Sequence, residues 1–199
     1  LTNENTLSYK KTFRRLHNLD LMVGFTVEKF QQHNFSLKGT GYLSDDIKWN
    51  NMEAIPDKNN LSPASSFNER TRNSVLGRFN YNYKKRYYFT FTARVDGSSN
   101  FAANNKYAFF PSGAFKWMIS KEPFMKQVNW LDDLSLRLSA GVSGNDAISY
   151  YRSMEALSSS TSGYLFGYNQ PLAVYPSRLE SKDLTWEKTT MYNAGIDFS

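Results

Sequence analysis

Cysteine is absent from the sequence, and histidine occurs only twice among its 199 residues. The lack of cysteine excludes a disulfide-bonded scaffold and any metal site built from thiolates. His17 and His33 lie apart in the chain, and no recognisable partners complete a catalytic triad or a zinc centre around either one. The sequence therefore predicts that the chain is not an enzyme and that it has no metal site and no cofactor.

Long hydrophobic runs are also missing, because no stretch of about 18 apolar residues occurs. The first residues, LTNENTLSYK, lack the basic and then apolar start of a signal peptide. We expect either a cytoplasmic protein or a piece of a longer chain. The net charge is +6, but Lys and Arg are scattered along the sequence, so nucleic acid is not an expected partner.

Aromatic residues are abundant, with 13 Tyr and 15 Phe, although the chain is polar overall. Between Tyr87 and Val95, every second residue is apolar or aromatic, and polar or amphipathic residues stand between them. The same alternation runs through 19–28, 74–83, 134–143 and 189–198, and more weakly through 6–15 and 109–120. A period of two indicates β-strands. We expect an all-β fold of about seven strands, with one short helical turn after Pro123.

The links between these segments alternate in length. Tight links are predicted near 16–18 and 84–85 and a short one at 121–132, whereas 31–70, 97–107 and 144–183 are longer. Antiparallel up-and-down strands would gather all short links at one end of the sheet. Short turns at one end and long loops at the other are typical of a transmembrane β-barrel, with short periplasmic turns and long extracellular loops. The segment 86–96 also matches the roughly 9–11 residues that a tilted strand needs to cross a bilayer.

Aromatic residues lie beside the short links, as they do in the interfacial girdles of membrane barrels. Tyr83 and Tyr87 flank Lys84-Lys85, and Trp117 and Trp130 flank the link that contains Pro123. The apolar residues of 87–95 would then face lipid, and the polar residues would face a wet or plugged lumen. Asp96-Gly97 is predicted to be a turn into an outer loop, with Gly97 at positive φ.

A soluble β-sandwich remains an alternative, because it also uses alternating strands, with the apolar faces packed inward. In that case the long links would form a carbohydrate-binding surface. A passive porin or a non-transporting adhesin is a third possibility.

The long links hold the candidate ligand-contacting residues. Aromatic faces stack on sugar rings, and amides form paired hydrogen bonds with hydroxyl groups. The candidates are Trp49, Tyr164, Phe166, Tyr168, Asn169 and Tyr175. Separately, Arg78, Arg94 and Arg137 stand at polar positions of the alternation and are predicted to face the lumen.

Four phrases of the sequence carry a family likeness when they are taken in order. They are VLGRFNYNYKKRYYFTFTARVDGSSNF, YAFFPSGAFKWMISKEPFM, WLDDLSLRLSAGVSGN and LTWEKTTMYNAGIDF. Together they resemble the SusC/RagA-like TonB-dependent transporters of Bacteroidetes outer membranes. The family's typical form has arginines where this chain has Val95 and Asn100, so any cation contacts at those two positions are in doubt.

This resemblance implies a location in the bacterial outer membrane and a barrel of about 22 strands around a plug domain. It also implies partners: a SusD-like surface lipoprotein, the TonB complex, a glycan or peptide substrate, and outer-membrane lipid. Residues 1–199 are accordingly expected to form a single partial barrel segment, with the plug and the remaining barrel absent from this chain. The lumen-facing arginines would contact the plug or hydrate the lumen.

Overall fold

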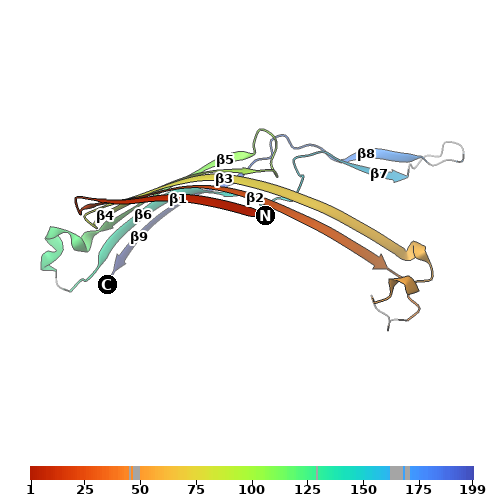
Figure 1. Ribbon diagram of the computed structural model, residues 1–199, viewed down its shortest axis with the longest axis horizontal. Helices are drawn as coiled ribbons and strands as arrows, with labels where there is room; N and C mark the ends of the chain where they lie inside the picture. The colour runs from red at the N-terminus through yellow and green to blue at the C-terminus, as the bar shows by residue number, and fades with distance from the viewer. Residues whose placement is uncertain (45, 47–49, 129, 162–167, 169–170) are drawn as a thin grey trace. The chain divides into compact units, whose positions relative to one another are not determined.

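The computed structural model describes residues 1–44, 46, 50–128, 130–161, 168 and 171–199. Within them a seven-stranded sheet has the order β1-β2-β3-β4-β5-β6-β9 (Figure 1). Its strands are β1 (Thr2–Phe13), β2 (His17–Gly39), β3 (Leu61–Tyr83), β4 (Tyr87–Ser98), β5 (Tyr107–Met118), β6 (Leu134–Asn145) and β9 (Glu187–Phe198). A separate two-stranded sheet consists of β7 (Ala156–Thr161) and β8 (Leu172–Arg178).

Helical structure in the described residues is limited to 3-10 turns: η1 (Met52–Ala54), η2 (Lys58–Asn60), η3 (Ile119–Lys121) and η4 (Pro123–Gln127). The turn that begins at Pro123 confirms the predicted helical turn. Among the described residues, no helix is long and apolar enough to cross a membrane.

The chain divides into two compact units. One contains Leu1–Lys29 and Thr71–Ser199, and the other contains Phe30–Arg70. In the second unit the last part of β2 and the first part of β3 carry polar side chains that bond across the pair, such as the Gln31 amide to Glu69 at 2.6 Å. The predicted link of 31–70 is therefore mostly strand, and the true link is 40–60. The alternation of the sequence did not reveal these strands, because apolar residues such as Phe35 and Phe67 are too sparse in them to form a regular series.

The strand register confirms that the alternating apolar residues share one face. Phe91 of β4 lies opposite Phe79 of β3 and Gly113 of β5, and Phe89 lies opposite Tyr81 and Phe115. Directly opposed residues in an antiparallel pair lie on the same side of the sheet. Phe89 and Phe91 are nevertheless 44% and 51% exposed. A sandwich would bury these rings in its core, so the structure argues against the sandwich alternative.

The two hairpin turns lie side by side at one end of the sheet (Figure 1). The Lys84 amide donates to the Leu16 carbonyl at 2.7 Å, which joins the β1–β2 turn directly to the β3–β4 turn. The link that carries η3 and η4 lies at this end too, whereas 99–106 and the described parts of 146–186 lie at the other. The predicted separation of short and long links holds in this unit.

Candidate functional site

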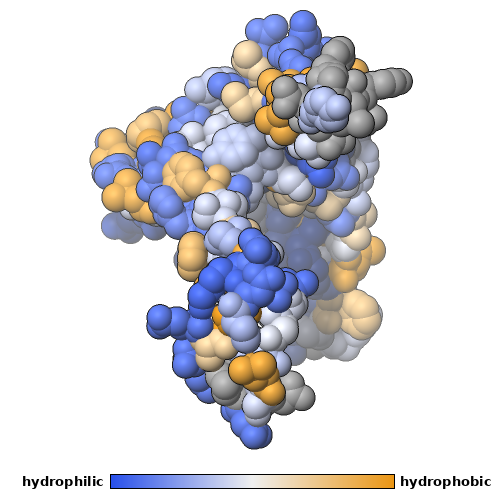
Figure 2. Space-filling view, turned by 90° about the vertical axis from the view of Figure 1, so that its right-hand side faces the viewer, coloured by the Kyte–Doolittle hydropathy of each residue, from blue (hydrophilic) through white to orange (hydrophobic). Residues whose placement is uncertain are grey.

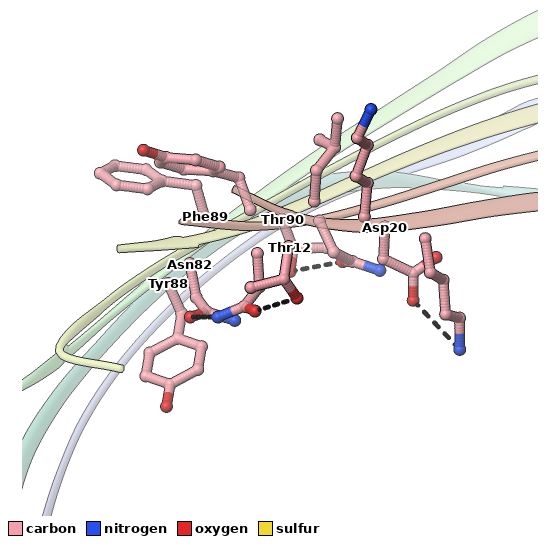
Figure 3. Close-up of a pocket in the computed structure, with 12 residues that line it drawn as sticks. Thr12, Asp20, Asn82, Tyr88, Phe89 and Thr90 are labelled. Carbon is pink, nitrogen blue, oxygen red and sulfur yellow. Dashed lines mark hydrogen bonds and ion pairs between the residues drawn. The ribbon is translucent and has the colours of Figure 1, made fainter. Parts of the chain in front are cut away.

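The face opposite the apolar one is polar and internally bonded near the short turns. The Thr12 hydroxyl donates to Asn18 at 2.7 Å, and the Asn18 amide donates to Asn82 at 2.8 Å, which links β1, β2 and β3. Figure 3 shows Thr12, Asn82 and Tyr88 on one side of the strands and the ring of Phe89 on the other. A hollow of about 480 Å³ lies here. The alternation thus separates two chemically distinct surfaces within single strands.

The three predicted lumen arginines all lie on this polar face, and two of them are held by carboxylates. Arg94 donates to Asp96 at 2.5 Å and to the Ser74 hydroxyl at 3.0 Å. Arg137 donates to Asp197 across the β6–β9 pair at 2.7 Å. Arg78 lies opposite Thr92 on the same side of the sheet. Their contact with a lumen or a plug stays a prediction.

Two of the predicted ligand-contacting residues fall in described parts of the chain. Tyr168 is fully exposed. Tyr175 lies in β8, opposite Ser158 of β7, and is half-exposed. The other four, Trp49, Tyr164, Phe166 and Asn169, lie outside the described residues. Substrate contact by this set stays a prediction.

A junction that sequence reasoning missed joins the strands at the long-loop end. Asp146, which follows β6, is only 6% exposed. Arg72 of β3 binds both of its carboxylate oxygens, with Nε 2.7 Å from Oδ2, and the Ser98 hydroxyl donates at 3.1 Å. A buried carboxylate requires such partners, because taking a lone charge out of water is costly. Three segments far apart in the sequence are thereby joined at one side chain.

The structure corrects the prediction for Asp96-Gly97. Gly97 lies inside β4 rather than in a turn, and among the described glycines only Gly41 has positive φ. Glycine is needed for a different reason: a Cβ at position 97 would overlap Asn73 and Tyr107. The following Ser98 and Asn100 are each 2% exposed, so these two polar side chains are buried, and only Ser99 between them is exposed. One sign of this burial is visible in the sequence, because the small residues from Gly97 to Asn100 are followed directly by Phe101.

Asn100 and Val95, which stand where the family typically has arginines, have clear roles here. The Asn100 amide donates to the Asp146 carbonyl at 3.4 Å. Val95 lies on the apolar face, opposite Val75 and Phe109. Position 100 therefore holds the junction with a neutral amide, and position 95 belongs to the surface that would face lipid.

A small aromatic core stabilises the same end. Phe101 and Trp186 are 1% and 8% exposed, and their ring centroids lie 4.9 Å apart. Phe110 of β5 meets Trp186 edge-on at 5.3 Å. The Trp186 indole donates to the Lys106 carbonyl at 2.9 Å, so its one polar atom is satisfied. This core fixes the start of β9 against the 99–106 link.

The β7–β8 hairpin extends the long 146–186 link and presents apolar side chains. Leu157, Leu172 and Val174 are each more than 60% exposed. Val174 pairs with Ser159 and Leu172 with Thr161, which places all three apolar residues on one side of the hairpin. Figure 2, viewed toward the right-hand side of Figure 1, shows apolar side chains at the surface among polar ones. Such a small sheet needs other contacts to be stable.

One buried carboxylate, that of Glu122, connects three segments of the chain at the short-turn end. Glu122, between η3 and η4, accepts from the Trp117 indole at 3.1 Å and from Arg86 at 3.3 Å. Hydrogen bonds from Tyr87 and then Trp117 lower the pKa of Glu122, because they stabilise its charged form. Tyr83, Tyr87 and Trp117 form a row of rings beside it, with centroids 6.5 and 6.3 Å apart.

No cluster of three or more His, Asp or Glu that could hold a metal ion occurs in the described part of the chain. The candidate site therefore consists of the apolar and the polar face of the sheet, together with the contacts at its two ends. The described residues form no recognisable reactive centre.

A family model, described as the β-barrel of TonB-dependent receptor-like proteins, matches residues 2–199. The chain belongs to this family.

Relatives of the TonB-dependent receptor barrel extend the comparison. TonB-dependent receptor P3 of Formosa agariphila is 38% identical over 195 residues, which cover 98% of this chain and 19% of the relative. TonB-dependent receptor SusC of Bacteroides thetaiotaomicron is 36% identical over 186 residues, 92% of this chain and 18% of that protein. The chain thus spans about a fifth of the length of these curated relatives. They are named as receptors rather than as enzymes.

A solved structure with the same architecture is that of the RagAB peptide transporter. It matches with a TM-score of 0.82 and 28% identity, over 98% of this chain and 21% of that one. The antiparallel strands are accordingly a fragment of a TonB-dependent receptor barrel. The predicted family and fold class are both confirmed.

Proposed function

We propose that this chain forms part of the wall and outer loops of an outer-membrane, TonB-dependent importer of large nutrients. One observation carries the proposal: a continuous apolar face runs in register from β3 to β9 and stays exposed, while the reverse face is polar. In water such a face would drive aggregation. In a bilayer it is the surface that a barrel presents to lipid.

The polar face belongs to the lumen in this proposal. Arg78, Arg94 and Arg137 meet lumen water or a plug domain, and the carboxylate partners of Arg94 and Arg137 keep those charges in place. The open edges β1 and β9 pair with further strands of the barrel, because backbone groups at membrane depth must be hydrogen-bonded. Residues 1–199 then act as one barrel segment.

The long-loop end faces outward and takes substrate and partner. A SusD-like surface lipoprotein is the proposed partner, and the exposed face of Leu157, Leu172 and Val174 offers it apolar contact. The substrate class is glycans or peptides, which Tyr168 and Tyr175 would contact by stacking. The likeness to SusC and to the RagAB peptide transporter supports these assignments. Contact with the TonB complex falls to a part of the protein beyond these strands.

The proposal is tested by placing arginine on each face of the sheet in the full receptor. Phe91→Arg puts a charge near the centre of the apolar face and should lower the free energy of unfolding by about 2–4 kcal/mol. Ala114→Arg is the matched control, because this exposed residue of β5 lies on the polar face opposite Thr90 and Ser139, where the charge stays hydrated. Urea unfolding in lipid vesicles measures both, and uptake assays with and without TonB follow.

Equal losses for the two variants would contradict the assignment of the faces. Uptake that does not depend on TonB would instead favour a passive porin. A receptor that partitions into the aqueous phase would remove the membrane assignment altogether.

A further inference from the structure

The two hairpin turns at the short-turn end are built from cations in a strained backbone. Arg14 and Arg15 have φ of 48° and 58°, and Lys84 and Lys85 both have φ of 53°. Turns with positive φ at both central residues normally use Asn-Gly or Asp-Gly, because a side chain with a Cβ strains there. Four of the five described non-glycine residues with positive φ are thus basic residues in these two turns. Each turn is closed by a backbone hydrogen bond, from the Leu16 amide to the Phe13 carbonyl at 3.1 Å and from the Arg86 amide to the Tyr83 carbonyl at 3.0 Å. The turn geometry therefore does not need the basic side chains, which leaves their charges available for another role.

These charges lie on one small surface. The hydrogen bond from Lys84 to the Leu16 carbonyl sets the turns side by side. Lys11 adds a further cation, since it pairs with Leu19 on the apolar face, and its ammonium lies 5.0 Å from the Phe13 ring centroid. The Lys84 ammonium lies 5.0 Å from the ring of Tyr83, also on the apolar side.

Two carboxylates at this end of the sheet already have cationic partners in ion pairs, although the Tyr87 hydrogen bond and, more weakly, the Lys84 charge also contribute to lowering the pKa of Glu122. Glu122 pairs with Arg86, and Asp20 pairs with Lys10 on the polar face. Among the described residues, no carboxylate forms an ion pair with the cations of this cluster. We call it the basic turn cluster, and its members are Lys11, Arg14, Arg15, Lys84 and Lys85.

An apolar depression lies on the same face, further along the strands. It holds about 720 Å³, and its lining includes Gly113, Ala140 and the rings of Phe79, Phe91 and Phe115. Phe91 lies six residues beyond Lys85, or about 20 Å at the usual rise of a strand. This is the reach of a phospholipid acyl chain from its headgroup. Gly113 makes the depression possible, because the missing side chain leaves a gap between neighbouring rings.

We propose that the basic turn cluster and this depression together hold an anionic phospholipid. The headgroup phosphate binds the cations, and an acyl chain lies along β4 toward Gly113. Lys and Arg near a membrane surface attract anionic headgroups, and their long side chains reach the headgroup level from the apolar side. The cation–ring contacts of Lys11 and Lys84 keep these side chains on the lipid side. This inference rests on the proposed lipid-facing role of the sheet.

The test removes the charges while improving the turns. The variant R14N/R15G/K84N/K85G places Asn-Gly in both hairpins, the sequence that this geometry prefers, so a folding defect is not expected. The control variant K106Q/R152Q/K182Q/K188Q lowers the net charge equally by changing exposed cations at the long-loop end. A second variant, R14K/R15K/K84R/K85R, preserves the charge. Native mass spectrometry of the full receptor then measures retained phosphatidylglycerol and phosphatidylcholine.

We expect the Asn-Gly variant to retain phosphatidylglycerol at least about tenfold less well than the parent, given the contribution of each basic residue near a charged surface. Both other variants should behave as the parent does, and phosphatidylcholine should be unaffected throughout. Equal retention of the two lipids by the parent would overturn the proposal. Full competition by inorganic phosphate would overturn it too, because the cluster would then be a simple anion site.

Two outcomes separate this inference from the proposed function. If the receptor inserts into phosphatidylcholine bilayers but shows no preference for the anionic lipid, the lipid site fails and the barrel assignment stands. If it does not insert at all, both fail. If the Asn-Gly variant keeps phosphatidylglycerol yet loses uptake, the turns bind an acidic protein segment, and the lipid proposal is wrong.

Discussion

The links between strands are stabilised by different kinds of contact at the two ends of the sheet. At the short-turn end the chain reverses within three residues, and the turn backbone itself is strained at Arg14, Arg15, Lys84 and Lys85. At the long-loop end the reversals are long, and order comes from a buried ion pair and a cluster of aromatic rings. The difference shows that a long connection can build a small core of its own, whereas a short turn is ordered by its backbone.

This contrast has a physical basis. Closing a longer loop costs only slightly more entropy for each doubling of its length. The real cost lies in ordering its residues, which a small core must offset. Trp186 and Phe101 supply that core, and Asp146 fixes the segments that surround it. The two hairpin turns are closed by backbone hydrogen bonds instead, and their central residues are all basic.

Removal of the aromatic core should have the largest effect on this comparison. Trp186→Ala leaves a cavity between Phe101 and Phe110 and should cost about 3–5 kcal/mol. Hydrogen exchange should accelerate in 99–106 and at the start of β9, and it should stay unchanged in the two short turns. Trp130→Ala is the control, because Trp130 is 81% exposed and should cost less than about 0.5 kcal/mol. Faster exchange at both ends would mean that they are one cooperative unit.

Breaking the buried ion pair should have the next largest effect. Asp146→Ala leaves Arg72 and Ser98 without their acceptor and should cost about 1–3 kcal/mol. The lower part of this range is expected, since Arg72 is partly exposed and can be hydrated. Glu180→Ala serves as the matched control, because its pair with Lys182 is exposed on both sides and should cost at most about 1 kcal/mol. Denaturant unfolding in vesicles distinguishes them, and a larger loss at Glu180 would reverse the ranking of the two pairs.

The smallest expected effect is a loss of stability, dependent on pH, when the Glu122 carboxylate at the short-turn end is replaced. The lowered pKa of Glu122 means that the carboxylate contributes stability above its ordinary pKa. That stability is lost as the pH falls through the lowered value. Glu122→Gln should therefore be less stable than the parent at neutral pH, and the difference should vanish in acid. Parallel stability profiles for the two proteins across this range would show that the charge of Glu122 is irrelevant.

The sequence predicted the parts of the fold that depend on local alternation. The faces of β4 and β6, the separation of short and long links, and the turn at Pro123 all follow from neighbouring residues. The last part of β2 could not be predicted, because most of its side chains are polar and the apolar Phe35 and Leu37 are too few to make the alternation visible. The β7–β8 hairpin was missed because its strands are short and lie within a long link.

The long-loop junction could not be predicted for a different reason. Arg72 and Asp146 are 74 positions apart, and neither residue belongs to a recognisable motif. Polar residues such as Ser98 and Asn100 signal a solvated turn unless their distant partners are known. The strained turns were also missed, since basic residues are unusual where positive φ is required. Contacts between distant residues decide both features, and a single sequence does not reveal such contacts.

The register of β3 to β9 also determines where the gene can change length. Side chains at odd-numbered positions of β4 lie on the apolar face and those at even-numbered positions on the polar face. One inserted codon would therefore move every following side chain of the strand to the opposite face. A library of single-codon insertions should therefore be depleted across β4, β5 and β6 and enriched in the links between strands. The connections are then the positions at which related genes can differ in length, while the strands keep theirs.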